Sequence, residues 1–181
     1  SRNTVAGAVA ALGNLVSASK NGKSESQQEM SDRTEVLLAK LAGQVTKSAV
    51  AGEDPIEAGE GRAALIAQKL SSTGANSARL ASASGSFSLN ASESLSSVLP
   101  ENSGDVVLSV ATLNDTGYPS DVESSGLVSI KVLQGSNEQS VSDLESPFVF
   151  RLRTSAELTR SPRCRYWNPS TGAWAYDGVE T

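Results

Sequence analysis

The sequence has 181 residues, of which 38% are hydrophobic and only 4% aromatic, so a core of ordinary size must be built mainly from Val, Leu and Ala. Its 15 basic and 20 acidic side chains give a formal net charge of −5 and are interspersed along the chain, which argues against a nucleic-acid partner. No apolar run approaches the roughly 20 residues that a membrane-spanning helix needs, so no membrane span is expected in this piece.

The chain begins at Ser1, and no charged start, apolar centre and cleavage site of a secretion signal follow it in order. A start at Ser rather than Met favours an excerpt or a processed chain. A first helix is then predicted, because apolar residues recur at spacings of four, three and four. They are Val5, Val9, Leu12 and Val16.

A second helix is indicated by Asp32 and Glu35, which resemble a capping box. The apolar residues after them share a helical spacing and are Leu37, Leu38, Leu41 and Val45.

A third helix is predicted to begin at Asp54 and Pro55, which resemble an N-cap followed by proline at the first helical position. Its apolar face would consist of Ile56, Ala63, Ile66 and Leu70. Gly59 and Gly61 weaken its first half, because each glycine costs about 1 kcal/mol relative to alanine in a helix interior. We therefore expect residues 1–74 to form a helical subdomain.

After residue 74 the apolar period changes from 3.6 to 2, which predicts strands with one buried face. The alternating residues fall in four groups: Phe87 and Leu89; Val106, Leu108 and Val110; Val128, Ile130 and Val132; Phe148, Phe150 and Leu152. Segments with turn chemistry separate them at 100–104, 114–119 and 134–137. The expected fold is therefore α+β: an N-terminal helical segment followed by an antiparallel β-sandwich over residues 75–181 that ends in a hairpin.

Residues that could carry catalysis are scarce. The sequence has no histidine, which removes Ser-His-Asp and Cys-His hydrolysis and most zinc sites. The acidic pairs 53–54 and 143 with 145 are flanked by polar residues and are interpreted as solvated loops. The segment 59–62 lacks the spacing of a glycine-rich phosphate loop. Asn114, Asp115, Asp121 and Glu123 match no EF-hand spacing and are better explained as a turn. We expect no catalytic residue, no cofactor and no metal site.

The C-terminal segment concentrates the aromatic residues of an aromatic-poor chain. Residues 164–178 contain both tryptophans and two of the three tyrosines. Residues 168–172 read Asn-Pro-Ser-Thr-Gly and are typical of a turn, so the segment is predicted to be a hairpin whose tryptophans cover one end of the sandwich.

This segment resembles the GPS motif, which closes the GAIN domain of adhesion receptors and of the large polycystins. The motif has a cysteine, two residues, a tryptophan, a short turn, a second tryptophan and then a glycine. The matching residues, with the tyrosine between the first two, are Cys164, Tyr166, Trp167, Trp174 and Gly178. The resemblance extends upstream, because the family also places a helical subdomain before a β-sandwich, and residues 147–152 resemble the strand before its first cysteine.

The departures from the motif favour one branch of the family. Val179 stands where the four-cysteine version has its second cysteine, as in the polycystin-like version with one disulfide. This favours a polycystin-like or egg-jelly-receptor-like protein over an adhesion receptor. The last cysteine and the His-Leu-Ser/Thr self-cleavage tripeptide of the family would lie beyond Thr181, so the domain is expected to be truncated at its C-terminal end.

The resemblance implies a non-catalytic extracellular structural or adhesion module of a membrane-anchored, polycystin-like surface protein, on the outer face of the plasma or ciliary membrane. Its partners would be the rest of its own precursor beyond Thr181 and other surface proteins or glycans. The alternative is a structural or ligand-binding subunit of a surface or ciliary assembly that does not cleave itself. An intracellular enzyme would need Cys164 as a reactive thiol, and the sequence offers no histidine or evident base to activate it.

Two covalent modifications are predicted if the chain is extracellular. The resemblance implies that Cys164 forms a disulfide with a cysteine outside this chain; the alternative is a buried thiol that acts as a small apolar residue. Two glycosylation sequons begin at Asn90 and Asn114, although two are expected nearly by chance in a chain so rich in Ser and Thr.

Overall fold

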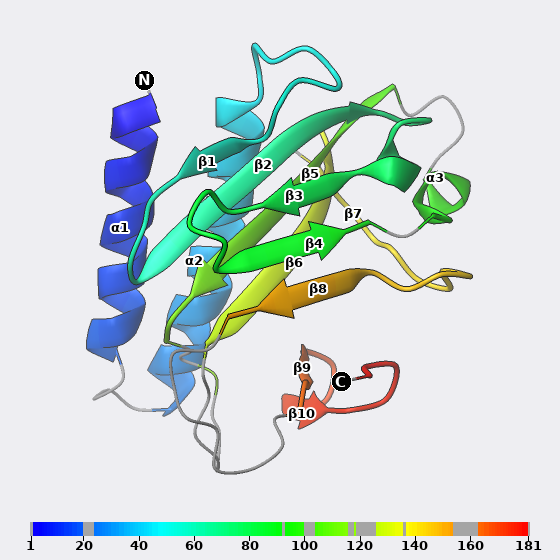
Figure 1. The fold of residues 1–181 in the computed structure, drawn as a ribbon. Coiled ribbons are helices and arrows are strands. Elements are labelled where there is room, and N and C mark those ends of the chain that lie inside the picture. The colour runs from blue at the N-terminus through cyan, green and yellow to red at the C-terminus, as the bar shows by residue number, and fades with distance from the viewer. Residues whose placement is uncertain are drawn as a thin grey trace.

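The computed structural model describes residues 2–19, 24–91, 93–99, 104–115, 118, 126–135, 137–153 and 163–180. Two long helices come first, and antiparallel sheets of five, three and two strands follow them (Figure 1). The helical elements are α1 (Arg2–Ser19), α2 (Ser24–Val45), the 3-10 turn η1 (Ala75–Ser77) and α3 (Leu95–Val98). The strands are β1 (Ile56–Ala58), β2 (Ala63–Ser71), β3 (Arg79–Ala81), β4 (Phe87–Asn90), β5 (Asp105–Leu113), β6 (Leu127–Gln134), β7 (Asn137–Gln139), β8 (Val149–Leu152), β9 (Tyr166–Asn168) and β10 (Ala173–Ala175). The expected α+β class, with helices first and antiparallel strands after them, is confirmed.

The five-stranded sheet, in the order β1-β2-β5-β6-β7, forms the middle layer of the molecule. Its longest pairing joins β2 to β5 over nine residues, from Ala63 opposite Leu113 to Ser71 opposite Asp105. Because successive side chains of a strand point to opposite faces, β2 and β5 supply apolar side chains to both faces of this sheet.

α1 and α2 cover one face of the five-stranded sheet; in Figure 1, α2 passes behind the sheet and α1 lies at its left. Val9 of α1 and Leu38 of α2 are almost fully buried against Leu65 of β2 and Val107 of β5. The predicted apolar stripes therefore face the sheet, as the amphipathic pattern requires. Leu37 is the exception: it was predicted to belong to the stripe of the second helix but is 45% exposed.

The three-stranded sheet, in the order β3-β4-β8, covers the opposite face and lies in front of the larger sheet in Figure 1. Leu80, Leu89 and Leu108 are fully buried between the two sheets. Full burial of a leucine side chain contributes about 1.5–3 kcal/mol, so this layer is a main source of stability. The four predicted strand groups correspond to β4, β5, β6 and β8.

The predicted third helix is wrong, because residues 56–71 form the hairpin β1–β2. Gly59 and Gly61 have φ of 79° and 77°, in the left-handed region, and turn the chain between the two strands. A Cβ on Gly59 would lie 2.6 Å from Cγ1 of Val9, so only glycine fits where this turn passes α1. The strands therefore begin at Ile56 and not after residue 74, and the helical part ends at Val45.

The capping interpretation of Asp32 is also wrong. α2 begins at Ser24, so Asp32 and Glu35 lie inside the helix, one turn apart. Of the predicted turns, 134–137 joins β6 to β7 with Gly135 at a φ of 63°. Residues 100–103 of the first predicted turn and residues 116, 117 and 119 of the second lie outside the described residues.

Candidate functional site

The C-terminal segment forms the predicted hairpin at one end of the sandwich, below β8 in Figure 1. β9 and β10 pair antiparallel with Trp167 directly opposite Trp174. The turn is closed by the amide of Gly172, which donates to the carbonyl oxygen of Asn168 at 2.9 Å. Oδ1 of Asn168 also accepts the amide of Ser170 at 3.0 Å, the Asx-turn chemistry that favours asparagine here.

The two tryptophans form a cluster of three aromatic rings with Tyr118, which lies outside the hairpin. Tyr118 stacks on Trp167 with ring centroids 4.7 Å apart and planes at 25°. Its centroid lies 6.0 Å from that of Trp174, edge to face, and the two indoles are 5.5 Å apart. Each such pair adds about 0.5–1.5 kcal/mol to the burial of its surface. Tyr118 is only 6% exposed, so its ring is buried where the hairpin packs on it.

The hydroxyl of Tyr118 connects this cluster to α2. Oη lies 2.8 Å from Oδ1 of Asp32 and 2.7 Å from Oε1 of Glu35, so two carboxylates compete for one hydroxyl hydrogen. The other oxygen of Glu35 accepts a hydrogen bond from Oγ of Ser129 at 2.9 Å and lies 3.8 Å from Nζ of Lys131. A continuous polar path therefore runs from the hydroxyl of Tyr118 through α2 to β6.

Neighbouring carboxylates and burial determine the protonation of Tyr118 and Tyr166. Burial, and then the negative charge of Glu35, raise the pKa of Tyr118 far above its ordinary value. Its hydroxyl therefore stays a neutral donor at any physiological pH. Tyr166 is partly buried, and its hydrogen bond to Asp177 at 3.0 Å raises its pKa. Neither hydroxyl is tuned toward a general base, which needs a pKa near 7.

The hairpin also carries a cation and an unsatisfied donor. The guanidinium of Arg165 lies 4.5 Å from the ring centre of Trp174, within cation–π distance. Nε1 of Trp167 is buried and has no acceptor among the described residues. An unsatisfied buried donor costs about 1–3 kcal/mol, so the inner side of the hairpin is the least satisfied part of the site.

The remaining predicted motif residues flank the two short strands. Cys164 is partly buried two residues before β9 and, as the single cysteine of the sequence, makes no disulfide within the chain. Gly178 follows β10 with a φ of 76°. The predicted bridge from Cys164 to a cysteine outside the chain stays a prediction.

Both predicted glycosylation residues are exposed. Asn90 is the last residue of β4, and Asn114 follows β5 with its side-chain amide donating to the carbonyl oxygen of Gly61 at 3.0 Å. The hydroxyl residues of both sequons, at 92 and 116, lie outside the described residues. Exposure meets one requirement for a sugar, and the modification itself stays a prediction.

No metal centre is assembled in the described part of the chain, which holds no group of three histidine, cysteine or acidic side chains able to share an ion. The oxygen ligands considered at 121 and 123 lie outside it. Likewise, no helix among the described residues combines the length and apolarity needed to cross a membrane.

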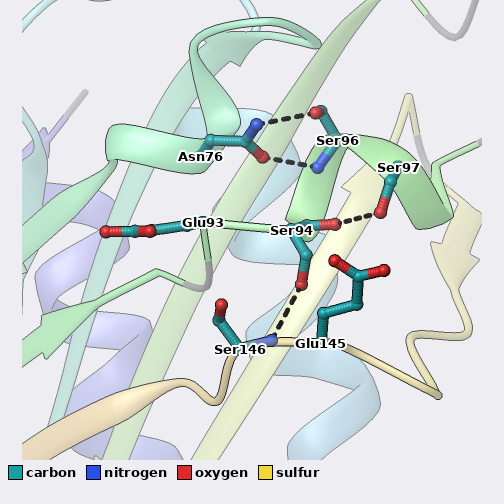
Figure 2. A pocket seen from close by; sticks show the side chains of 7 residues that line it. All are labelled: Asn76, Glu93, Ser94, Ser96, Ser97, Glu145 and Ser146. Atoms are coloured by element: carbon teal, nitrogen blue, oxygen red, sulfur yellow. Dashed lines mark hydrogen bonds between the residues drawn. The ribbon is translucent and has the colours of Figure 1, made fainter.

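A polar hollow of about 340 Å³ lies between η1, α3 and the segment before β8 (Figure 2). It is lined by Asn76, Glu93, Ser94, Ser96, Ser97, Glu145 and Ser146. The amide of Asn76 donates to Oγ of Ser96 at 2.7 Å and accepts from its backbone N–H at 2.6 Å. Oγ of Ser94 accepts the amide of Ser146 at 3.2 Å. These hydrogen bonds hold α3 to η1 and to the segment before β8. We therefore interpret the polar residues around the hollow as structural.

Sequence reasoning found the hairpin and missed Tyr118. The turn signal at 114–119 was recognised, but no local pattern shows that one tyrosine of that turn packs on two tryptophans about 50 residues later.

Comparison with known proteins agrees with the hairpin motif. A family model described as GPS, GAIN subdomain B, matches residues 61–181, which are 121 of the 181 residues and run from the start of β2 through the hairpin. Among curated proteins no match was found.

Proposed function

The chain belongs to the GPS family, whose GAIN subdomain B model matches residues 61–181, and we propose that it is a non-catalytic, extracellular structural module of a membrane-anchored surface protein. Domains of this family are typical of adhesion-type surface receptors and belong to their extracellular parts. The observation that carries the proposal is the pair Trp167 and Trp174, placed opposite each other in the hairpin and packed on Tyr118.

The proposed role of the module is to hold this hairpin in a defined position. α1, α2 and the two larger sheets form the supporting body, and Tyr118 joins the hairpin to α2 through its ring and its hydroxyl. The side chains at the junction suit attachment more than chemistry, because the aromatic rings pack against one another and the carboxylates are occupied by hydroxyl and ammonium groups.

The extracellular location can be tested on cells that express the full precursor. An antibody raised against the 181-residue chain should stain intact cells as strongly as permeabilised ones. An antibody to an established cytoplasmic protein serves as the control, because it should stain permeabilised cells only. Staining that appears only after permeabilisation would contradict the proposal.

Within the family, Val179 supports the polycystin-like branch with a single disulfide in this motif. We propose that Cys164 pairs with a cysteine of the precursor outside these residues, next to Trp167. Such a bridge contributes about 2–4 kcal/mol. Thiol labelling of the unfolded, non-reduced protein from its native source checks the pairing: protected Cys164 is the expected result, and quantitative labelling overturns it.

A further inference from the structure

The outer face of the three-stranded sheet has a charge opposite to that of the molecule as a whole. Along β3, β4 and β8 the side chains alternate, and those facing the core include Leu80, Leu89 and Phe150. The residues on the outer side are Arg79 and Ala81 of β3, Ser88 and Asn90 of β4, Val149 and Arg151 of β8, and Arg153, which extends β8. We call this surface the arginine face; it is turned toward the viewer in Figure 1.

The three arginines of this face are exposed, and none makes an ion pair or hydrogen bond with a described side chain. Arg33 and Lys131 differ in this respect, because Arg33 pairs with Glu29 and Lys131 with Glu138. No acidic residue occurs on β3, β4 or β8, although the whole chain has a net charge of −5. The arginine face is therefore a local positive field on an acidic protein, which attracts anions.

The spacing of the arginines suits an extended anion. Arg151 and Arg153 are two residues apart on one strand, about 7 Å. Arg79 lies two strands away from Arg151 and two residues out of register with it, a separation of about 12 Å. Each guanidinium can bind an oxyanion with two parallel hydrogen bonds. Ser88 and Asn90 lie between the arginines and offer neutral donors and acceptors to hydroxyl groups.

We propose that the arginine face binds a sulfated polysaccharide of the cell surface or matrix. A protein partner is disfavoured, because the described residues of this face include no aromatic side chain to form the buried centre of a protein interface. A lipid surface is disfavoured as well, since Val149 is the one large apolar residue on this face and offers little to insert. The proposal rests on the extracellular location, which brings the face into contact with such polymers.

Asn90 lies on the arginine face, so its glycosylation should affect binding there. Its side chain is exposed between Arg79 and Val149, so a glycan attached there would cover the arginine face. Chain produced without glycans should therefore bind the polymer at least as tightly as chain that carries a sugar at Asn90.

The test uses heparin as the probe and the full 181-residue chain produced without glycans. We expect binding that weakens steeply between about 50 and 200 mM salt. The triple variant Arg79→Ser, Arg151→Ser, Arg153→Ser should lose about tenfold or more in affinity. The control Arg33→Ser, Lys40→Ser, Lys47→Ser removes the same charge from exposed positions at and beyond α2 and should retain most of the affinity.

Circular dichroism of both triple variants should match that of the unchanged chain, since all six positions are exposed. Three results overturn the proposal: no heparin binding at low salt, an equal loss in both triple variants, or equally effective competition by polyglutamate or by vesicles containing phosphatidylserine. Because heparin binding by the purified chain does not depend on where the cell places it, a failure here is separate from a failure of the antibody test.

Discussion

β2 and β5 pair over nine residues and are buried on both faces, whereas β9 and β10 pair over three residues and pack with both tryptophan rings on Tyr118. The sandwich depends on many buried apolar side chains, each of which contributes a part of the free energy of unfolding. The hairpin depends on a few aromatic pairs and one shared hydroxyl. A single substitution in the sandwich should therefore destabilise the whole sandwich, whereas a single substitution at the hairpin should detach only the hairpin. This difference is expected for regions that open at different free energies.

The largest effect is expected from Leu108→Ala in the middle of β5. Leu108 is 0% exposed between the two larger sheets, so the substitution leaves a cavity and should lower the free energy of unfolding by about 2–5 kcal/mol. Urea denaturation followed by circular dichroism measures it. Leu37→Ala on the exposed side of α2 is the matched control and should cost far less; equal losses would show that the sheet interface is not the main core.

Gly59→Ala should have the next largest effect and tests how the first strands are joined to α1. The new Cβ would lie 2.6 Å from Cγ1 of Val9 at a φ of 79°, so clash and backbone strain together should cost about 1–3 kcal/mol. Gly61→Ala separates the two causes, because its φ is 77° but no atom lies within 4 Å of a Cβ there. Thermal unfolding should place Gly59→Ala below Gly61→Ala, and the reverse order would contradict the packing of this turn on α1.

The same turn shows why part of the fold could not be predicted from the sequence. β4, which has one buried face, and β6, whose Val128, Ile130 and Val132 alternate with other residues, show the period of two and were predicted correctly. β2 is buried on both faces, so its run of Ala, Leu and Ile has no alternation, and Ala63, Ile66 and Leu70 happen to fit a helical spacing. The helix prediction followed from that coincidence.

At the candidate site, local sequence predicted the hairpin but not its attachment. The Asn-Pro-Ser-Thr-Gly turn and the paired tryptophans are local features, and the structure confirms them. The hydrogen bonds of Tyr118 join it to Asp32 and Glu35, which lie 86 and 83 residues earlier. Contacts of such separation arise only when the layers assemble, and the two acids were instead interpreted as a helix cap.

A smaller effect is expected from pH. The pKa of Tyr118 is raised in the folded chain above its ordinary value of 10.0, so below about pH 10 the folded and unfolded chains both keep this proton and its contribution to stability is complete. As the pH rises above 10, the unfolded chain loses the proton first and the contribution falls. Hairpin docking followed by tryptophan fluorescence should therefore not respond to Tyr118 between pH 7 and 9 and should weaken above about pH 10.

The variant Tyr118→Phe is the control for the alkaline effect, because it has no hydroxyl to titrate. Its fluorescence should change less above about pH 10 than that of the unchanged chain. An identical alkaline change in both proteins would assign the effect to other groups.

The central claim is that Tyr118 holds the hairpin to α2 through both its ring and its hydroxyl, and hydrogen exchange of β9 and β10 amides in three proteins tests it most directly. Tyr118→Phe keeps the ring stacking and loses the hydrogen bonds to Asp32 and Glu35, so hairpin protection should fall by about 1–3 kcal/mol. Tyr118→Ala removes the ring as well and should lower it further, while protection of β2 and β5 changes much less in either variant. Unchanged protection of the hairpin in Tyr118→Ala, or an equal loss in β2 and β5, would contradict the account.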